Sequence, residues 1–98
     1  IAIGTSSTAP AITDTQLGAE TARAVISTAT QISATQARIK AFFTDGALAN
    51  GTYYEIGSFV DGTGTANSGK IFNHSLFSTP YAKSAGTDTT IQLDIYFA

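Results

Sequence analysis

The sequence predicts an all-β protein, a small antiparallel β-sandwich or barrel-like domain with long Gly/Thr/Ser loops. Of its 98 residues, 43% are hydrophobic and ten are aromatic, which is enough apolar material for one modest core. β-Branched and aromatic residues are concentrated in short runs that alternate with polar residues. Turn pairs such as Asn-Gly and Asp-Gly separate these runs at the short spacing typical of sandwiches and barrels.

The whole chain, residues 1–98, has the length of a single domain. It opens in the middle of an apolar pattern, Ile1-Ala2-Ile3-Gly4, and without an initiator methionine. We therefore expect that a short N-terminal segment is missing, and that Ile1–Ile3 is the end of a strand.

A central strand is predicted at Thr52–Val60, directly after the turn pair Asn50-Gly51. Aromatic or aliphatic residues fall on both faces of this run, which indicates that both faces are at least partly covered. Gly57 interrupts the run. A glycine inside a strand indicates that another backbone or a large ring approaches closely, or that the strand contains a bulge.

The stretch Glu20–Thr44 has two interpretations. Its alanines and glutamines favour a helix, whereas its many threonines, isoleucines and valine restrict the torsion χ1 and favour strands. Because the second half alternates between apolar and polar residues, we expect two antiparallel strands. They are predicted at Thr21–Ala29 and Ala34–Thr44, joined by a turn near Thr30–Ser33.

Capping, turn and alternation signals predict the remaining elements. These are a helical turn from Thr13 through Leu17, a flexible hairpin tip at Asp61–Gly69, strands at Lys70–Phe77 and Thr89–Phe97, and a loop at Ser78–Thr87 that contains Pro80. The apolar positions of the strands predict a core made of Ile39, Phe43, Ile56, Phe59, Ile91, Leu93, Ile95 and Phe97.

The charge pattern excludes several classes of partner. Only 12% of the residues are charged, against about 25% in a typical domain. The formal net charge is −2 and the five cations are scattered, so we expect neither nucleic acid nor a membrane as a partner. A surface of uncharged polar residues suits extensive contact with neighbouring proteins.

Two ionisable residues are candidate functional residues. His74 is the only histidine, and its neighbours Asn73 and Ser75 point to the opposite face of the predicted strand, which favours a surface or interface histidine. Glu55 lies in a mostly apolar strand, where a carboxylate is costly unless it is paired or hydrogen-bonded. It is either a catalytic acid or, as we expect, a buried anchor for a cation such as Arg23 or for loop amides.

The aspartates give no metal-binding signature. Asp14, Asp45, Asp61 and Asp88 lie in predicted turns or loops, where aspartate is common, and no Asp-x-Asp-x-Asp run is present. The glycines of the predicted hairpin tip lack the helix and the lysine of a phosphate-binding loop. The sequence therefore predicts no catalytic, cofactor-binding or metal-binding residues.

Three segments that occur in a characteristic order carry a family resemblance. They are the opening Ile1-Ala2-Ile3-Gly4-Thr5 with Thr8-Ala9-Pro10, Asp14-Thr15, Leu17, Glu20 and Ala22-Arg23; the stretch Ala49-Asn50-Gly51-Thr52 that leads into Tyr54-Glu55-Ile56-Gly57-Ser58-Phe59; and Gly69–Phe77 with Pro80, Lys83 and the alternating last strand. In this order they resemble a group of structural proteins of tailed bacteriophages, which includes tail-collar and tail-fibre-type domains. The long tip Asp61–Gly69 and the polar Asn73-His74-Ser75 depart from the pattern of that group.

The resemblance implies a non-enzymatic component of the virion, in a tail fibre, collar or other tail-associated structure, that acts through subunit assembly. Its partners would be other virion proteins and copies of itself in a symmetric oligomer, with a host surface glycan as a further ligand and no cofactor. It would be assembled in the cytoplasm of the bacterial host. The alternatives are a capsid head-decoration protein, a carbohydrate-binding module that uses exposed Tyr53, Tyr81 or Tyr96, and a pilin-like filament subunit in which Glu20–Thr44 is helical.

Overall fold

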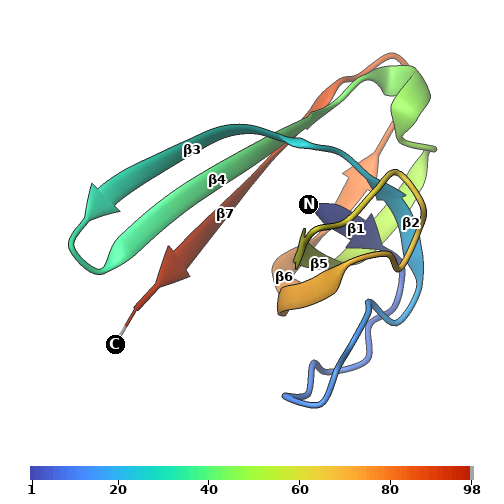
Figure 1. Cartoon of the computed structure of the whole chain (residues 1–98). Coiled ribbons are helices and arrows are strands. Elements are labelled where there is room, and N and C mark those ends of the chain that lie inside the picture. The colour runs from blue at the N-terminus through green and yellow to red at the C-terminus, as the bar shows by residue number, and fades with distance from the viewer. Residues whose placement is uncertain (98) are drawn as a thin grey trace.

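The chain forms two antiparallel β-sheets in a computed structural model that describes residues 1–97 (Figure 1). The first sheet has the strand order β2-β1-β5-β6, and the second has the order β3-β4-β7. The strands are β1 (Ala2–Gly4), β2 (Glu20–Arg23), β3 (Ile26–Ser33), β4 (Gln36–Phe43), β5 (Gly51–Val60), β6 (Lys70–Lys83) and β7 (Thr89–Tyr96). Within residues 1–97 the only helical element is the short 3₁₀ turn η1 (Asp45–Ala47), so the prediction of a small all-β, sandwich-like domain is confirmed. None of these residues belongs to a helix with the length and apolar character needed to cross a membrane.

The predicted strand Thr21–Ala29 is in fact two strands in different sheets. β2 pairs with β1 in the first sheet, and β3 pairs with β4 in the second, so Ala24 and Val25 carry the chain from one sheet to the other. The turn predicted near Thr30–Ser33 is also wrong, because β3 continues to Ser33, which pairs with Gln36. The β-branched and uncharged residues of this segment favour extended backbone, and none is a glycine, asparagine or aspartate that would start a turn.

β6 is longer than predicted, because the segment beyond Phe77 continues as a strand to Lys83. Its pairing with β5 jumps from Tyr53 opposite Tyr81 to Glu55 opposite Leu76, which places a bulge at residues 77–80. The bulge contains Pro80, and β6 lies at the edge of its sheet. Proline is tolerated in strands at such edge and bulge positions, so the predicted loop Ser78–Thr87 is confined to residues 84–88.

The core lies where the two sheets meet. It is formed by Ile1, Ile3, Ala41, Phe43, Leu48, Tyr53, Ile56, Ile91 and Leu93, with Ile39, Phe77, Tyr81 and Ile95 partly buried against them. Half of the predicted core residues are buried, namely Phe43, Ile56, Ile91 and Leu93. Ile39, Phe59 and Ile95 are half-buried, and Phe97 is 53% exposed because it lies beyond the end of β7.

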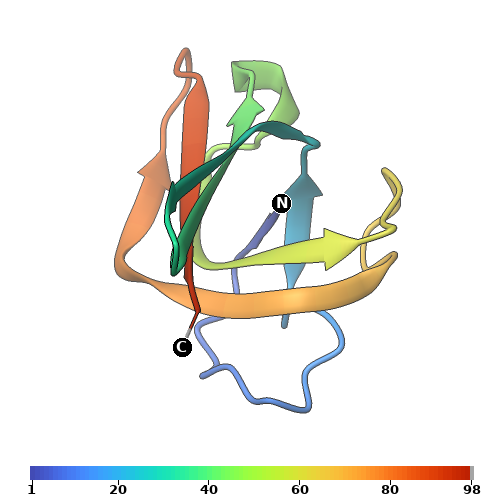
Figure 2. The same cartoon turned by 60° about the vertical axis from the view of Figure 1, so that its left-hand side comes forward.

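The three-stranded sheet projects from the body of the molecule (Figure 1). Its inner face carries directly paired apolar residues such as Ile39 and Leu93, and its outer face carries polar pairs such as Arg38 and Asp94. Figure 2 shows β6, in orange, running across the molecule, with the loop between β1 and β2, in blue, below it. Every residue of β3, an edge strand of the projecting sheet, is exposed.

Candidate functional site

The carboxylate of Glu55 is fully buried in the middle of β5, with an exposed fraction of 0%. Oε1 accepts a hydrogen bond from the Gly18 amide at 2.8 Å and lies 2.8 Å from Nε2 of His74. Oε2 accepts from the amides of Ala19 at 2.7 Å and Ser6 at 3.1 Å. These four contacts replace the hydration that an ionised carboxylate loses when it is buried.

Through these bonds Glu55 fastens both ends of the loop between β1 and β2, residues 5–19, to the sheet. Ser6 lies at the start of the loop and Ala19 at its end, where the Ala19 carbonyl also accepts from the Thr5 amide at 3.0 Å. The prediction that Glu55 anchors loop amides is confirmed. The predicted partner Arg23 is wrong, because the Arg23 side chain binds a different carboxylate.

Glycines leave room for the loop to lie against the sheet. A Cβ atom on Gly4 would collide with the Glu55 carboxylate, and one on Gly57 would lie 2.8 Å from Cδ2 of Leu17 and from the carbonyl oxygen of Asn73. Leu17 is buried, so the loop inserts one large apolar side chain directly over Gly57. The close approach that was predicted at Gly57 is therefore confirmed, although a loop side chain supplies part of it.

Asp14 shapes the loop from within. Its amide donates to the Ala11 carbonyl at 3.0 Å, and its Oδ2 accepts from the Ala11 amide at 2.8 Å. Oδ2 also lies 2.8 Å from Nδ1 of His74. The Ala11 amide, and after it His74, lower the pKa of Asp14 below its usual value. This turn replaces the helical turn predicted from Thr13 through Leu17, because Asp14 bonds back to Ala11 and Leu17 is drawn onto the sheet.

His74 lies between the two carboxylates, with a side chain that is only 8% exposed. β6 places it opposite Gly57, so that Nε2 reaches Glu55 and Nδ1 reaches Asp14. Both ring nitrogens are therefore occupied by contacts with carboxylates of the chain itself. Of the predicted surface or interface histidine, the surface part is wrong, because the loop of residues 5–19 folds over the ring, and the interface part stays a prediction.

The Asp14–His74–Glu55 set is a clamp for the loop. A histidine that activates a hydroxyl needs a nitrogen that is free to accept a proton, and here both nitrogens face carboxylates. Over residues 1–97 no group of three or more His, Cys, Asp or Glu side chains is placed to hold a metal ion. The cluster connects a strand, a neighbouring strand and a loop, and its geometry favours a structural role.

A second charged cluster holds the Gly-rich segment Asp61–Gly69. Nε and Nη2 of Arg23 each bind the Glu20 carboxylate at 2.7 Å. Nη1 donates to the carbonyl oxygens of Thr63 at 3.2 Å and Ser68 at 3.1 Å. This segment was predicted to be a flexible tip, but the structure ties it to β2 through Arg23.

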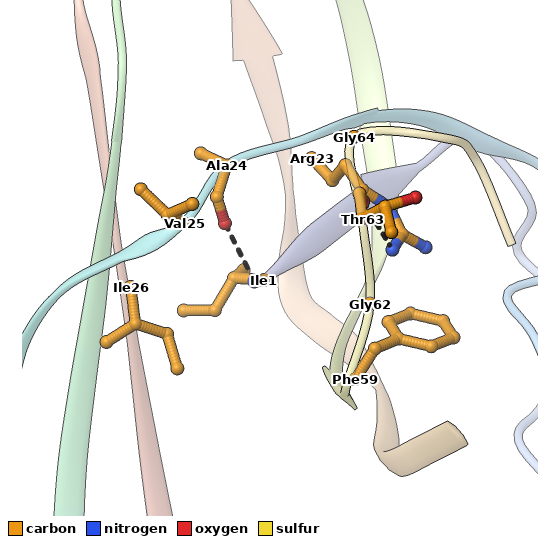
Figure 3. Close-up of a pocket in the computed structure, with 9 residues that line it drawn as sticks. All are labelled: Ile1, Arg23, Ala24, Val25, Ile26, Phe59, Gly62, Thr63 and Gly64. Atoms are coloured by element: carbon orange, nitrogen blue, oxygen red, sulfur yellow. Dashed lines mark hydrogen bonds between the residues drawn. The ribbon is translucent and has the colours of Figure 1, made fainter. Parts of the chain in front are cut away.

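A shallow hollow lies beside this cluster (Figure 3). Its lining includes Ile1, Val25 and Phe59, and the Arg23 guanidinium lies 4.6 Å from the centre of the Phe59 ring. Burial opposes the ionisation of Glu20, but hydrogen bonds from Arg23 and a loop amide outweigh it and lower the pKa of Glu20. The charged groups of this cluster therefore bind one another and the neighbouring loop.

Lys83 is a buried cation that no sequence pattern marks as a site. Its side chain is 0% exposed, and Nζ donates to Oδ1 of Asp45 at 2.6 Å and to the Ser84 carbonyl at 2.9 Å. Asp45 also accepts from the Gly86 amide at 3.0 Å, and Asp88 accepts from the Asp45 amide at 2.9 Å. Asp45 and Asp88, two of the predicted loop aspartates, therefore hydrogen-bond the segment around residue 45 to the loop of residues 84–88 next to Lys83.

The other candidates lie apart from these clusters. Asp61 occupies a turn with a φ of 58°, as expected for a loop aspartate. Of the three tyrosines considered for glycan binding, Tyr53 is buried and donates to a loop carbonyl, and Tyr81 is half-buried and shares a hydrogen bond with Thr89. Only Tyr96, at 70% exposure, presents an open ring.

The chain matches no protein-family model, no curated protein and no solved structure.

Proposed function

We propose that this protein is a non-enzymatic structural component of a tailed-bacteriophage virion, in the tail fibre, the collar or another tail-associated structure. It acts by assembly with other virion proteins and with copies of itself. The proposal rests on the order of the segments that resemble such proteins, and it is consistent with an uncharged polar surface. A projecting sheet and a long clamped loop offer contact surfaces to neighbouring subunits.

The observation that carries the proposal is that the resembling segments meet at one place. Gly4 and Leu17 come from the opening segment, and Glu55 and Gly57 come from the central one. Gly4 lies against the Glu55 carboxylate, and Leu17 lies against Gly57. The residues that carry the resemblance therefore pack against one another in this chain as one loop-on-sheet unit, which supports reading them together as a single pattern.

Immunogold labelling of particles from a lysate of the virus or host that encodes the chain tests the proposal. An antibody against the purified chain should label the tails of intact virions. Labelling of the head surface would support the capsid-decoration alternative. Particles that carry no label, although the same lysate contains the chain, would refute a virion role.

A carbohydrate-binding module remains a second candidate because of the exposed ring of Tyr96. Isothermal titration with host surface polysaccharide, compared between the wild type and Tyr96→Ala, tests this alternative. The pilin-like alternative required a helical Glu20–Thr44, and this stretch forms β2, β3 and β4.

A further inference from the structure

β3 is an edge strand that carries no charge and no proline to prevent pairing with another chain, and its two register shifts leave Thr28–Gln31 as a regular central stretch. Among residues 1–97, β4 is the only strand bonded to β3, so the backbone groups along its other side face outward. Sheet edges in monomeric proteins are commonly protected by a lysine, another charge or a proline. The segment from Ala24 to Ala37 has none of these and also lacks glycine.

The sequence of β3 is nearly the same when it is read in either direction from Ala29. Reading Ile26-Ser-Thr-Ala-Thr-Gln-Ile32, a threonine lies on each side of Ala29, then a serine or glutamine, then an isoleucine. Ile26 and Ile32 are each 44% exposed, although isoleucine is normally buried. In a twofold antiparallel pair centred on Ala29, residues equally far from Ala29 on its two sides lie opposite each other, so this near-symmetry brings residues of the same kind together.

We propose that the protein forms a twofold dimer in which β3 pairs antiparallel with β3 of a second copy, centred on Ala29. The pairing places Thr28 opposite Thr30 of the partner copy, within the stretch of β3 that lies between its two register shifts. Thr–Thr cross-strand pairs stabilise antiparallel sheets. The two projecting three-stranded sheets then form one continuous sheet, and the contact closes at two copies because it uses the free edge of β3 in both.

The pairing geometry and the charges agree with this dimer. The ladder between β3 and β4 is regular from Thr28 to Gln31 and shifts register on both sides, so the regular part coincides with the proposed centre. The nearest charged residues, Arg38 and Lys40, lie on β4, one strand behind the edge. Across the dimer these two strands are about 14 Å apart, three strand spacings. That distance exceeds the Debye length of about 8 Å at physiological salt, and Arg38 is paired with Asp94.

Sedimentation velocity of the purified chain tests the dimer. The wild type should approach twice the monomer mass of 10.1 kDa as its concentration rises. The double variant Thr28→Glu/Thr30→Glu should stay at the monomer mass, because it places like charges directly opposite each other across the axis. In the folded monomer the new carboxylates lie beside Lys40 and Arg38, which should preserve the fold. The matched control Thr90→Glu/Gln92→Glu adds the same charges to β7, the other edge of this sheet, and should remain dimeric.

Cysteine cross-linking tests the register, because the chain has no cysteine of its own. Ala29→Cys should form a disulfide-linked dimer on mild oxidation, and an equal mixture of Thr28→Cys and Thr30→Cys should cross-link to each other. Thr79→Cys, which is exposed on β6, should remain largely monomeric. A wild type that stays at 10.1 kDa at its highest soluble concentration would overturn the proposal, as would a β3 double variant that dimerises like the wild type.

The dimer deepens the assembly role proposed above, but the two ideas fail separately. A chain that dimerises through β3 and is absent from virions refutes only the virion role. A chain that is present in virions and monomeric in solution, with no cross-link at position 29 in the particle, refutes only the pairing through β3.

Discussion

One buried carboxylate, that of Glu55, holds both ends of a fifteen-residue loop, residues 5–19, and contacts a histidine. Glu55→Gln keeps the shape of the side chain but turns one acceptor oxygen into an NH₂ group that faces N–H donors. Because a buried ionic contact is broken from one side, we expect the free energy of unfolding to fall by about 3–5 kcal/mol. Urea denaturation measures this loss. The control Asp94→Asn breaks the partly exposed pair with Arg38 and should cost about 1 kcal/mol or less.

Double-variant cycles identify the partner of Glu55. Glu55→Gln and His74→Gln should be non-additive, because the two side chains are in contact. Glu55→Gln and Arg23→Gln should be additive, because Arg23 binds Glu20 instead. Coupling to Arg23 together with additivity with His74 would contradict the observed arrangement.

Acid should weaken the contacts of Asp14. Its pKa is lower in the folded chain than its usual value of 3.8, so its contribution to stability is present above that pH and is lost as the pH falls through the lowered pKa. Asp14→Asn should therefore reduce the thermal midpoint at pH 7, and the difference from the wild type should shrink below about pH 4. Thermal unfolding followed by circular dichroism across this range is the measurement. A difference that is constant with pH would show that ionised Asp14 contributes nothing.

At the scale of residues, the sequence predicted that the Glu55 carboxylate must be paired or hydrogen-bonded, but it did not predict which groups do this. A lone carboxylate in an apolar strand must be neutralised or bonded, and that requirement is local. The contact between His74 and Asp14 joins residues sixty positions apart through a loop without regular structure. Arg23 can bind a carboxylate bidentately, but it pairs with Glu20, which lies on the same short strand.

At the scale of elements, β5 and the loop above it fit only because position 57 has no side chain. Gly57→Ala would bring a Cβ atom within 2.8 Å of Leu17 and of the backbone of β6, so we expect a loss of stability. The cost of such overpacking is about 1–3 kcal/mol. Gly46→Ala is the control, since nothing lies within 4 Å of its Cβ position. The thermal midpoint of that control should change little, and an equal fall in both variants would contradict the proposed close packing.

Alternation within single strands predicted β5, β7 and most of β4 well. It could not show that the chain leaves one sheet and enters the other at Ala24 and Val25, because both halves of that segment are extended. The continuation of β6 through Pro80 was missed for a similar reason. A proline normally ends a strand, and the edge position that permits it depends on sheet order.

At the scale of the whole molecule, two adjacent phenylalanines of β4 lie on opposite faces of their sheet, one in the core and one on the outer face. Phe43 is 1% exposed in the core, and Phe42 points outward at 48% exposure. Phe43→Ala should lower the free energy of unfolding by about 3–5 kcal/mol, the usual range for a buried phenylalanine. Phe42→Ala should cost about 1 kcal/mol or less, as expected for a surface position. Similar losses in urea denaturation would show that the outer face of the sheet is covered as well.

The β-content and half of the predicted core were accessible from the sequence because burial follows local alternation. The sequence did not show how the two sheets are offset from each other. This offset helps to explain why some of the predicted core residues are not buried. Ile95 and Phe97 continue the apolar pattern of β7, but Ile95 is only partly buried against the core and Phe97 lies beyond the end of β7 at 53% exposure. Periodicity shows which face of a strand is apolar, and the layout of the sheets determines whether anything covers that face.

The closure of the loop of residues 5–19 at its base makes its tip a place where peptide could be inserted. Ile12 near the tip is fully exposed, while the anchoring bonds lie at Ser6, Gly18 and Ala19. Once the base is fixed, each doubling of loop length costs only about 0.6 kcal/mol of closure entropy. Foreign epitopes or affinity tags placed between Thr8 and Pro10, outside the turn that Ala11 and Asp14 form, should leave the scaffold folded, so the domain can serve as a carrier for displayed peptides.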